Sequence, residues 1–334
     1  MLAIRKAAPQ PGLVCHEVEA PAVDRDDGVL IRVEAAGICG TDLHIADWTA
    51  GYEAMASAMP VTLGHEFAGK VERGPSDWLG RRVVVRPSVT CGHCEGCRQR
   101  GEDGCTARTG IGIRRNGGFA SLASVPVRNC VAVPEGLDPE LAALTEPMTV
   151  AAQAVARAGA VAGKRVLVLG PGPIGLGVAL FAERAGAAAL TIAGRDDAAR
   201  LACARALGFS DTRDALADDE PLAPAGFDVI FEATGVPEVA SAAQRLLAPG
   251  GVLVICGIHA RPASFDLTAM VRLEQGVVGS YRAPVARWSE VVAAIAGEPE
   301  RFRKLISHRL PLGEALDGFT LMRSRAAIKV MLQP

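Results

Sequence analysis

Four of the nine cysteines of this 334-residue chain lie within fifteen residues of one another. The spacing C-x2-C-x2-C-x7-C can place four thiolates around one zinc ion in a closed tetrahedral shell, at about 2.3 Å per Zn–S bond. Glycines at 92, 96, 101 and 104 would let so short a loop wrap an ion. A redox thiol pair needs only two cysteines, so we predict a structural zinc site with the ligands Cys91, Cys94, Cys97 and Cys105.

A glycine-rich turn follows the apolar segment 165–169 and leads directly into a helical pattern. In a G-x-G-x-x-G turn the first glycine makes the bend, the second lets backbone approach a pyrophosphate, and the third lets helix and strand pack closely. The start of the helix offers free N–H groups to the phosphates. A purely structural turn is the alternative. We predict a dinucleotide site that includes Gly170, Gly172, Pro173, Ile174 and Gly175.

The second strand of this region ends without the acidic residue that would bind the adenosine ribose of NAD. Gly194 and Arg195 stand there instead, and an arginine suits the 2′-phosphate of NADP. Asp196 and Asp197 follow at once and could bind ribose or repel phosphate. The sequence favours NADP over NAD, with Gly194 and Arg195 in the site.

A second group of candidate ligands is spread along the chain. Cys39 precedes Thr41 and His44, the pair His65-Glu66 follows Gly64, and Glu146 comes much later. Each residue also has a structural interpretation: a buried cysteine, a core histidine, or an acid at the start of a helix.

Taken together, these segments resemble the zinc-dependent medium-chain dehydrogenases/reductases, the alcohol and polyol dehydrogenase family. The stretch Cys39-Gly-Thr-Asp-Leu-His-Ile-x-x-Trp48 and the segment Thr109-Gly-x-Gly112 are closest to threonine and polyol dehydrogenases, whereas Glu146-Pro147 is closer to the sorbitol type. The motifs that carry the resemblance are Gly37-Ile-Cys39-Gly-Thr-Asp-x-His44, Gly64-His65-Glu66, the four-cysteine lobe, Glu146-Pro147, Gly170–Gly175, Phe231-Glu-Ala-Thr-Gly235 and Ile328-Lys-Val.

The resemblance implies a catalytic zinc held by Cys39, His65 and either Glu66 or Glu146. Zinc would stabilise the alkoxide that an alcohol must form before it releases hydride. The resemblance also implies a proton relay from the alcohol through the Thr41 hydroxyl and the nicotinamide ribose to His44. Three further positions match residues that line the substrate pocket in relatives: Trp48, Phe119 and Arg282.

The elements expected around these residues define an α/β protein. Short β-branched runs fill the first part of the chain, as at 29–34, 82–86 and 130–134, whereas strands alternate with Ala/Leu-rich helices from about residue 148. The second pattern predicts a doubly wound parallel sheet. The resemblance implies a GroES-like β catalytic domain over 1–147 and 281–334, with the structural zinc lobe at 91–105, and a Rossmann domain over 148–280.

Composition excludes several classes of protein. Thirty-five Lys and Arg against 37 Asp and Glu give a net charge of −2, which provides no basic surplus for nucleic acid. The apolar stretch 166–181 is too short and too interrupted to span a membrane, and the N-terminus lacks a signal-peptide pattern. We expect a cytoplasmic protein without a membrane partner, and the resemblance implies a homo-oligomer, a dimer or tetramer.

The predicted function is zinc-dependent hydride transfer between NAD(P) and a secondary alcohol or ketone of a polyol, cyclitol or amino alcohol. L-Threonine 3-dehydrogenase activity is the alternative within this class. A non-catalytic zinc- and dinucleotide-binding redox sensor is the alternative from another class.

Overall fold

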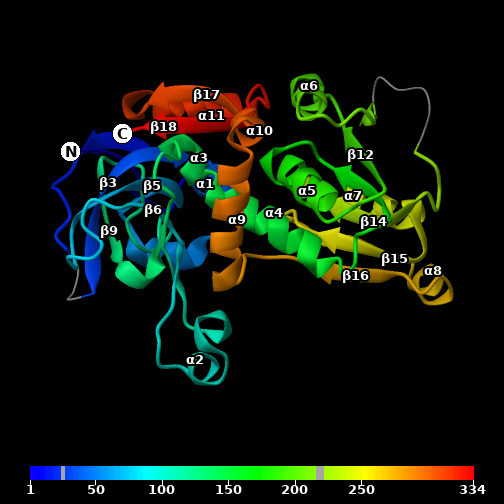
Figure 1. Cartoon of the computed structure of the whole chain (residues 1–334), viewed down its shortest axis with the longest axis horizontal. Helices are drawn as coiled ribbons and strands as arrows, with labels where there is room; N and C mark the ends of the chain where they lie inside the picture. The colour runs from blue at the N-terminus through cyan, green and yellow to red at the C-terminus, as the bar shows by residue number, and fades with distance from the viewer. Residues whose placement is uncertain (24–26, 216–221) are drawn as a thin grey trace. The chain divides into compact units, whose positions relative to one another are not determined.

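The computed structural model describes residues 1–23, 27–215 and 222–334, and it divides into two compact units. Unit 1 comprises Met1–Glu146 and Pro284–Pro334, and unit 2 comprises Pro147–Ala283. The chain therefore leaves unit 1, completes unit 2 and returns (Figure 1). Each unit is described by itself.

Unit 2 is built on a six-stranded sheet in which every registered pair is parallel. The strand order is β13-β12-β11-β14-β15-β16. Helices α5 and α7 contact the central strands (Figure 1), and Leu167, Ile230 and Leu253 are completely buried in the core. The strands are β11 (Arg165–Leu169), β12 (Ala189–Gly194), β13 (Thr212–Asp214), β14 (Phe227–Glu232), β15 (Leu247–Ile255) and β16 (Gly276–Gly279). The helices are α5 (Pro173–Arg184), α6 (Ala198–Ala206), α7 (Pro237–Ala243) and α8 (Leu267–Arg272), with the 3-10 turn η4 (Gln244–Leu246).

The strand order of this sheet reverses between β11 and β14. From β11 the chain moves outward through β12 to β13, and it then returns to β14 and moves the other way to β16. Ligands of open parallel sheets bind outside the carboxyl ends of the strands at such a switch point. The turns after β11, β14 and β15 are therefore the part of unit 2 that matters most for function.

Unit 1 contains a seven-stranded, mainly antiparallel sheet of order β10-β6-β5-β3-β18-β17, with β9 also paired to β3. Its long strand β3 alternates little and is buried along most of its length, and helix α3 (Pro139–Ala143) packs against it. The strands of this sheet are β3 (Gly28–Gly37), β5 (Glu66–Arg73), β6 (Arg82–Val85), β9 (Leu122–Pro126), β10 (Cys130–Ala132), β17 (Ile306–Pro311) and β18 (Lys329–Gln333). Smaller sheets pair β1 (Leu2–Lys6) with β2 (Val14–Glu17) and β4 (Val61–Thr62), and β7 (Ser88–Val89) with β8 (Thr109–Gly110).

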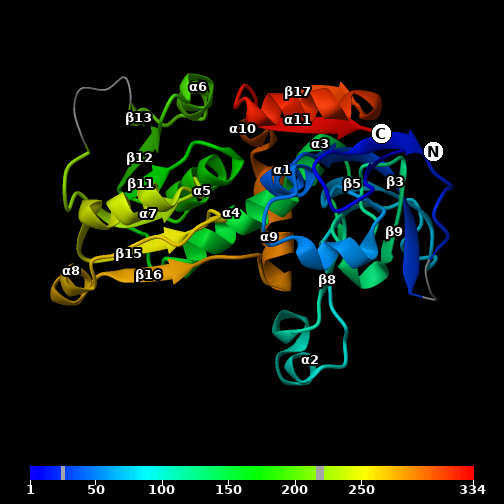
Figure 2. The ribbon, with the colours of Figure 1, turned by 180° about the vertical axis from the view of Figure 1, so that it is seen from behind.

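Helices surround these sheets. The four-cysteine segment with α2 projects away from the strands of unit 1 (Figures 1 and 2). Helix α4 begins in unit 1 and continues into unit 2. The helices are α1 (Gly40–Asp47), α2 (Glu95–Arg100), α3 (Pro139–Ala143), α4 (Thr145–Arg157), α9 (Val285–Gly297), α10 (Pro299–Arg303) and α11 (Ala315–Arg323). The 3-10 turns are η1 (Glu53–Ala58), η2 (Gly101–Gly104), η3 (Val127–Asn129) and η5 (Leu312–Glu314).

The α/β fold class predicted from the sequence is confirmed, with a GroES-like β unit and a Rossmann-type unit. The sequence pattern did not indicate β16 or β17, since both strands are short and only partly buried. Within the residues that the structure describes, no helix is long and apolar enough to cross a membrane.

Candidate functional site

Three of the metal ligands that the resemblance implies lie close together in unit 1. One ligand atom each of Cys39, His65 and Glu66 lie within 4.8 Å of one another. Cys39 stands at the N-cap of α1, and Glu66 is the first residue of β5. The register of the sheet brings the two together, because Glu66 pairs with Gly37 on β3, two residues before Cys39.

Local backbone geometry fixes this arrangement. The Cys39 N–H donates to Asp42 Oδ2 at 2.9 Å, which closes the first turn of α1. Gly64 has a φ of +89°, and a Cβ at this position would lie 2.4 Å from the Phe119 ring. Only glycine fits such a turn, and this turn orients His65 for the site.

The histidine of the set is oriented by a carboxylate. His65 Nδ1 lies 3.5 Å from Asp42 Oδ1, so Nε2 is the nitrogen left to bind a metal. Histidine ligands commonly direct their second nitrogen to a carboxylate in this way. Burial opposes the charged form, but Asp42 and the Cys39 thiol outweigh it and raise the pKa of His65 well above its ordinary value. Asp42 lies within the motif from Gly37 to His44, but no role was predicted for it from the sequence.

The carboxylate of the set has a buried cationic partner that the sequence analysis missed. Lys329 Nζ forms an ion pair with Glu66 Oε2 and donates to Ile38 O at 2.9 Å, and both side chains are about 1–2 % exposed. Gly37 leaves the space for this pair, because a Cβ there would lie 2.5 Å from Glu66 Oε2. The motif Ile328-Lys-Val was the available signal, but nothing in a C-terminal strand indicates a partner so distant in sequence.

The electrostatics of the donor set suit a cation. Burial, together with Glu66, raises the pKa of the Cys39 thiol. Burial also disfavours the Lys329 ammonium, yet Glu66 and Cys39 outweigh it and raise the pKa of Lys329. A divalent cation would stabilise the thiolate and the carboxylate together, so this sulfur, nitrogen and oxygen donor set fits zinc.

Glu146, the alternative ligand, lies near the set but is not among the three residues within 4.8 Å. Glu146 stands at the start of α4 and is partly exposed as a whole residue, whereas its carboxyl group is buried. Burial of the carboxyl, reinforced by the Glu66 charge, raises the pKa of Glu146 to about 7. The geometry thus favours Glu66 over Glu146 as the third ligand.

The four-cysteine lobe forms a compact sulfur cluster. The Sγ–Sγ distances are 3.5 Å for Cys94–Cys97, 3.7 Å for Cys91–Cys105, 3.9 Å for Cys91–Cys97 and 4.0 Å for Cys94–Cys105. Four sulfurs at about 2.3 Å from a common centre would be about 3.8 Å apart in a tetrahedron. The cluster therefore has the dimensions of a closed zinc shell.

Backbone contacts build this lobe. A Cβ at Gly96 would lie 1.8 Å from Gly104 O, so the two segments can approach only with glycine at this point. Thr106 N–H donates to Cys94 Sγ, and this bond, with a further one from the Cys97 backbone, lowers the pKa of Cys94 to about 5. A thiolate is the form that binds metal.

The glycine-rich turn of unit 2 has the geometry expected of a phosphate loop. Gly170 has a φ of +100°, and no atom lies within 4 Å of a Cβ built at Gly172. A Cβ at Gly175 would lie 1.9 Å from Gly170 O, which is the close packing of helix on strand. Pro173 and Ile174 begin α5 directly after this turn. The open second glycine leaves room for a ligand to approach the backbone.

The end of β12 carries the residues predicted to select the cofactor. Gly194 is the last residue of β12, and Arg195 is exposed. The backbone turns at Asp196, which has a φ of 54° and whose N–H donates to Asp214 Oδ1 at 3.1 Å. Asp197 lies beside Arg200, 3.7 Å from its guanidinium.

The predicted relay residues follow Cys39 on α1, where Thr41 and His44 are partly exposed. Thr49 Oγ1 lies 3.4 Å from His44 Nδ1, and the ring of Tyr52 is stacked on His44 with centroids 6.4 Å apart. The Thr49 hydroxyl therefore lies beside one ring nitrogen of His44, Nδ1.

The three predicted substrate residues differ in their surroundings. Trp48 is partly exposed at the end of α1, with Lys6 Nζ 5.2 Å from its ring. Arg282 is exposed, with its guanidinium 5.0 Å above the Tyr281 ring. Phe119 is completely buried and packs edge-on against Phe319. Core packing accounts for the presence of a large aromatic side chain at Phe119, so this residue is not part of the proposed substrate site.

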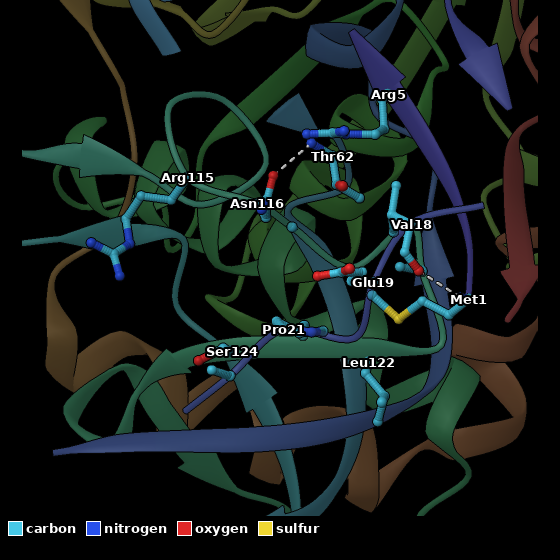
Figure 3. Close-up of a pocket in the computed structure, with 14 residues that line it drawn as sticks. Met1, Arg5, Val18, Glu19, Pro21, Thr62, Arg115, Asn116, Leu122 and Ser124 are labelled. Atoms are coloured by element: carbon cyan, nitrogen blue, oxygen red, sulfur yellow. Dashed lines mark hydrogen bonds between the residues drawn. The ribbon is translucent and has the colours of Figure 1, made fainter. Parts of the chain in front are cut away.

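A cavity of about 450 Å³ in unit 1 lies apart from these groups (Figure 3). Arg5, Glu19 and Asn116 are among the residues that line it, and Asn116 accepts a hydrogen bond from the Thr62 N–H. None of the predicted site residues is part of its lining.

Comparison with known proteins agrees with this architecture. Residues 25–135 match the alcohol dehydrogenase GroES-like domain, and residues 139–333 match the glucose dehydrogenase C-terminus. L-Threonine 3-dehydrogenase of Chelativorans sp. is 33% identical over 99% of this chain and 98% of its own length. The structure of 2R,3R-butanediol dehydrogenase from Bacillus subtilis superposes with a TM-score of 0.87 at 28% identity, covering 100% of this chain and 99% of that one. A candidate zinc-binding dehydrogenase from Sinorhizobium meliloti 1021, bound to NADP, gives a TM-score of 0.84 at 31% identity, with 100% and 99% covered.

A GroES-like β unit joined to a Rossmann-type unit, with a Cys/His/Glu donor set, defines a class of nicotinamide-dependent oxidoreductases. Within that class, the chain belongs to the zinc-dependent medium-chain dehydrogenase/reductase family of alcohol and polyol dehydrogenases. The hypothesis of a non-catalytic redox sensor is accordingly set aside.

Proposed function

We propose that the chain transfers hydride between NADP and a secondary alcohol or ketone of a polyol, cyclitol or amino alcohol. The observation that carries this proposal is the donor set of the partly exposed Cys39 and the buried His65 and Glu66, whose ligand atoms lie within 4.8 Å of one another. The phosphate-loop geometry of Gly170, Gly172 and Gly175 supports it independently.

Cys39, His65 and Glu66 would hold the catalytic zinc, with Glu146 as the alternative carboxylate. Zinc bound there supplies a Lewis acid that makes an alcohol hydroxyl acidic near neutral pH. Asp42 orients the His65 ring through Nδ1, and Lys329 balances the charge of Glu66.

Two residues of α1 would handle the proton of the reaction. The Thr41 hydroxyl would accept the proton of the substrate hydroxyl while its own proton passes on along the relay that ends at His44, whose ring would release a proton to solvent. Histidine suits this outer position because its ordinary pKa lies near working pH. Trp48 and Arg282 are the proposed substrate contacts.

The two units would have different functions in the reaction. Unit 1 is the proposed catalytic domain, and its lobe of residues 91–105 holds a second, structural zinc through Cys91, Cys94, Cys97 and Cys105. Unit 2 is the proposed dinucleotide domain. An exposed Arg195 beside Gly194 favours NADP, and the NADP-bound relative is consistent with that choice.

L-Threonine 3-dehydrogenase activity is the second candidate. Relatives that bear this name, from Chelativorans sp. and Sinorhizobium medicae, are 33% and 34% identical to the chain over 99% of its length. The stretch from Cys39 to Trp48 is also closest to that type. Both candidates use the same metal set and cofactor domain, and they differ only in the substrate.

We further propose a homo-oligomer, a dimer or tetramer, in the cytoplasm. Strand β16 is an edge strand, and the neighbouring α8 exposes Leu267 and Val271 by 68% and 77%. Exposed apolar side chains beside an open sheet edge favour pairing with a second copy. None of the nine cysteines, all of them in the described part of the chain, is in a disulfide, as is usual in a reducing compartment.

A substrate panel tests the proposed function. Zinc-loaded protein is assayed with butanediol, hexitols, cyclitols and L-threonine, each with NAD and with NADP, by the near-ultraviolet absorbance of the reduced cofactor. We expect reduction of NADP with one class of secondary alcohol. A response to L-threonine alone would select the second candidate, and a faster reaction with NAD would overturn the cofactor assignment. No response in either direction, with the corresponding ketones also tested, would contradict the proposal.

A further inference from the structure

A buried acid and a histidine in unit 2 take no part in the site described above. Glu232 ends β14, and His259 lies in the turn that follows β15. Both turns lie at the carboxyl ends of strands next to the switch point. They also adjoin the glycine-rich turn, because Ala233 N–H donates to Leu169 O at 2.8 Å and a Cβ at Gly170 would lie 2.9 Å from Thr234 Cγ2.

Glu232 holds both turns. Its side chain is completely buried, and Oε1 accepts from the N–H groups of Thr234 and Gly235 at 2.7 and 3.0 Å and from the Thr234 hydroxyl. Its carbonyl oxygen accepts from the N–H groups of Cys256 and Gly257 at 2.8 and 3.0 Å. One residue thus anchors the turn after β14 and the turn after β15.

The second carboxylate oxygen faces His259. Glu232 Oε2 has no hydrogen-bond donor among the residues that the structure describes, and it lies 3.3 Å from His259 Nε2. The other ring nitrogen, Nδ1, lies 3.0 Å from Gly257 O. Both ring nitrogens of His259 therefore face oxygen acceptors.

Among the described residues, no other side chain takes the place of His259 beside Glu232 Oε2. Burial, with the Glu232 carboxylate, raises the pKa of the Cys256 thiol to about 12, so the turn carries no second anion from that thiol. The nearby pair Arg261–Glu238 is 65–68% exposed and is satisfied within itself.

The two turns are packed tightly and carry exposed apolar side chains. A Cβ at Gly257 would lie 2.3 Å from Gly235 N, and one at Gly235 would lie 2.7 Å from Ile258 O. Val236 and Ile258, one on each turn, are 40% and 57% exposed. Apolar groups presented beside a nucleotide site can cover an aromatic ring of the bound ligand.

We propose that His259 and Glu232 are positioning residues that hold the turns after β14 and β15 in the geometry required to bind the dinucleotide. This inference rests on the proposed function of unit 2 as the dinucleotide domain. The contact between His259 and Glu232 orders the two turns before the cofactor binds, so that binding requires less additional ordering of these turns. Loss of the 3.3 Å contact between His259 Nε2 and the buried Glu232 carboxylate is expected to weaken binding about tenfold or more.

Calorimetric titration of the zinc-loaded full chain with NADP and NAD tests the proposal. The variants are His259→Ala, His259→Asn and His259→Gln, with Glu238→Gln as the matched control at the exposed pair. We expect Kd for the dinucleotide to rise about tenfold in the Ala and Asn variants. Gln, whose longer chain reaches Glu232, should restore most of the affinity, and the control should bind like the wild type. In turnover, KM for the cofactor should rise more than kcat falls.

Equal Kd values for the wild type and all three His259 variants would overturn the proposal while leaving the proposed function intact. Failure of the wild-type protein to bind either dinucleotide would overturn both. If His259→Ala does not fold, the Asn and Gln variants decide, because both keep a polar amide and differ by one methylene. Asn and Gln variants that bind equally well would contradict a positioning role.

Discussion

Replacing Lys329 by methionine should destabilise unit 1 severely. The variant removes the ammonium group from Glu66 while leaving that carboxylate about 1% exposed. Breaking a buried ion pair by removing one partner costs about 3–5 kcal/mol, because the remaining charge has no compensation. For a domain of about 150–250 residues, this corresponds to a fall in Tm of about 6–20 °C.

The comparison needs a surface pair as its control. Arg323 and Asp47 form an ion pair in the same unit, but their side chains are 42% and 48% exposed. Arg323→Met should therefore cost about 1 kcal/mol or less. Both variants and the wild type are stripped of zinc, so that no metal ion compensates the Glu66 charge, and are then unfolded by heat and by urea and followed by circular dichroism.

A double-mutant cycle separates the pair from simple loss of packing. The Glu66→Gln and Lys329→Met variants together should be more stable than the sum of their separate effects predicts, by about 1–3 kcal/mol. The reasoning is refuted if Lys329→Met costs no more than Arg323→Met, or if the two changes in the cycle are additive.

Three further predictions concern stability, the cofactor turn and the sulfur cluster. Hydrogen bonds from the Arg165 side chain and backbone lower the pKa of Asp228 to about 2, against about 3.9 in an unfolded chain. The resulting stabilisation is about 1 kcal/mol or less, because the pair is partly exposed. It is present above the pKa of the unfolded chain and is lost as pH falls towards 2. The free energy of unfolding in urea should therefore differ between Asp228→Asn and the wild type at neutral pH and become equal in acid. Gly172→Ala should leave Tm unchanged but weaken dinucleotide binding in calorimetry, whereas Gly175→Ala should lower stability by about 1–3 kcal/mol. Cys97→Ser should lower the zinc content of the chain by one ion and its Tm as well.

Each of these predictions has a contradicting result. A difference in the free energy of unfolding between Asp228→Asn and the wild type that stays constant from neutral pH to acid would show that the ion pair does not cause the stabilisation. Equal dinucleotide affinity in the Gly172 variant and the wild type would contradict a backbone approach at the open position of that turn. Full zinc content in the Cys97 variant would contradict a four-sulfur site.

Much of unit 2 could be predicted because its signals are local. The strand 165–169, the glycine turn and the helix after it follow one another in sequence, and each has a recognisable pattern. The four cysteines were equally accessible, since a short loop brings all of them to one ion. Where a single segment of the chain forms a whole site, the spacing of its residues was sufficient to predict that site.

The donor set of unit 1 required the resemblance to known proteins, because sheet pairing assembles it. The pairing of Gly37 with Glu66 brings Cys39 to Glu66, and strand β18 then adds Lys329 from the far end of the chain. No spacing rule predicts such contacts. The contact between Glu232 and His259 could likewise not be predicted from the sequence, since it depends on how two turns that are separate in sequence meet in the fold.

The most direct test of the account is the replacement of Cys39 by serine, with Cys15→Ser as the matched control at an exposed cysteine. Zinc per chain and the rate of cofactor reduction are measured for both variants and the wild type, with a substrate identified in the panel. We expect the Cys39 variant to lose one of two zinc ions and its turnover to fall by about three orders of magnitude or more, equivalent to about 4 kcal/mol of transition-state stabilisation. The Cys15 variant should match the wild type. A Cys39 variant that keeps both its zinc and its turnover would contradict the catalytic centre proposed for this protein.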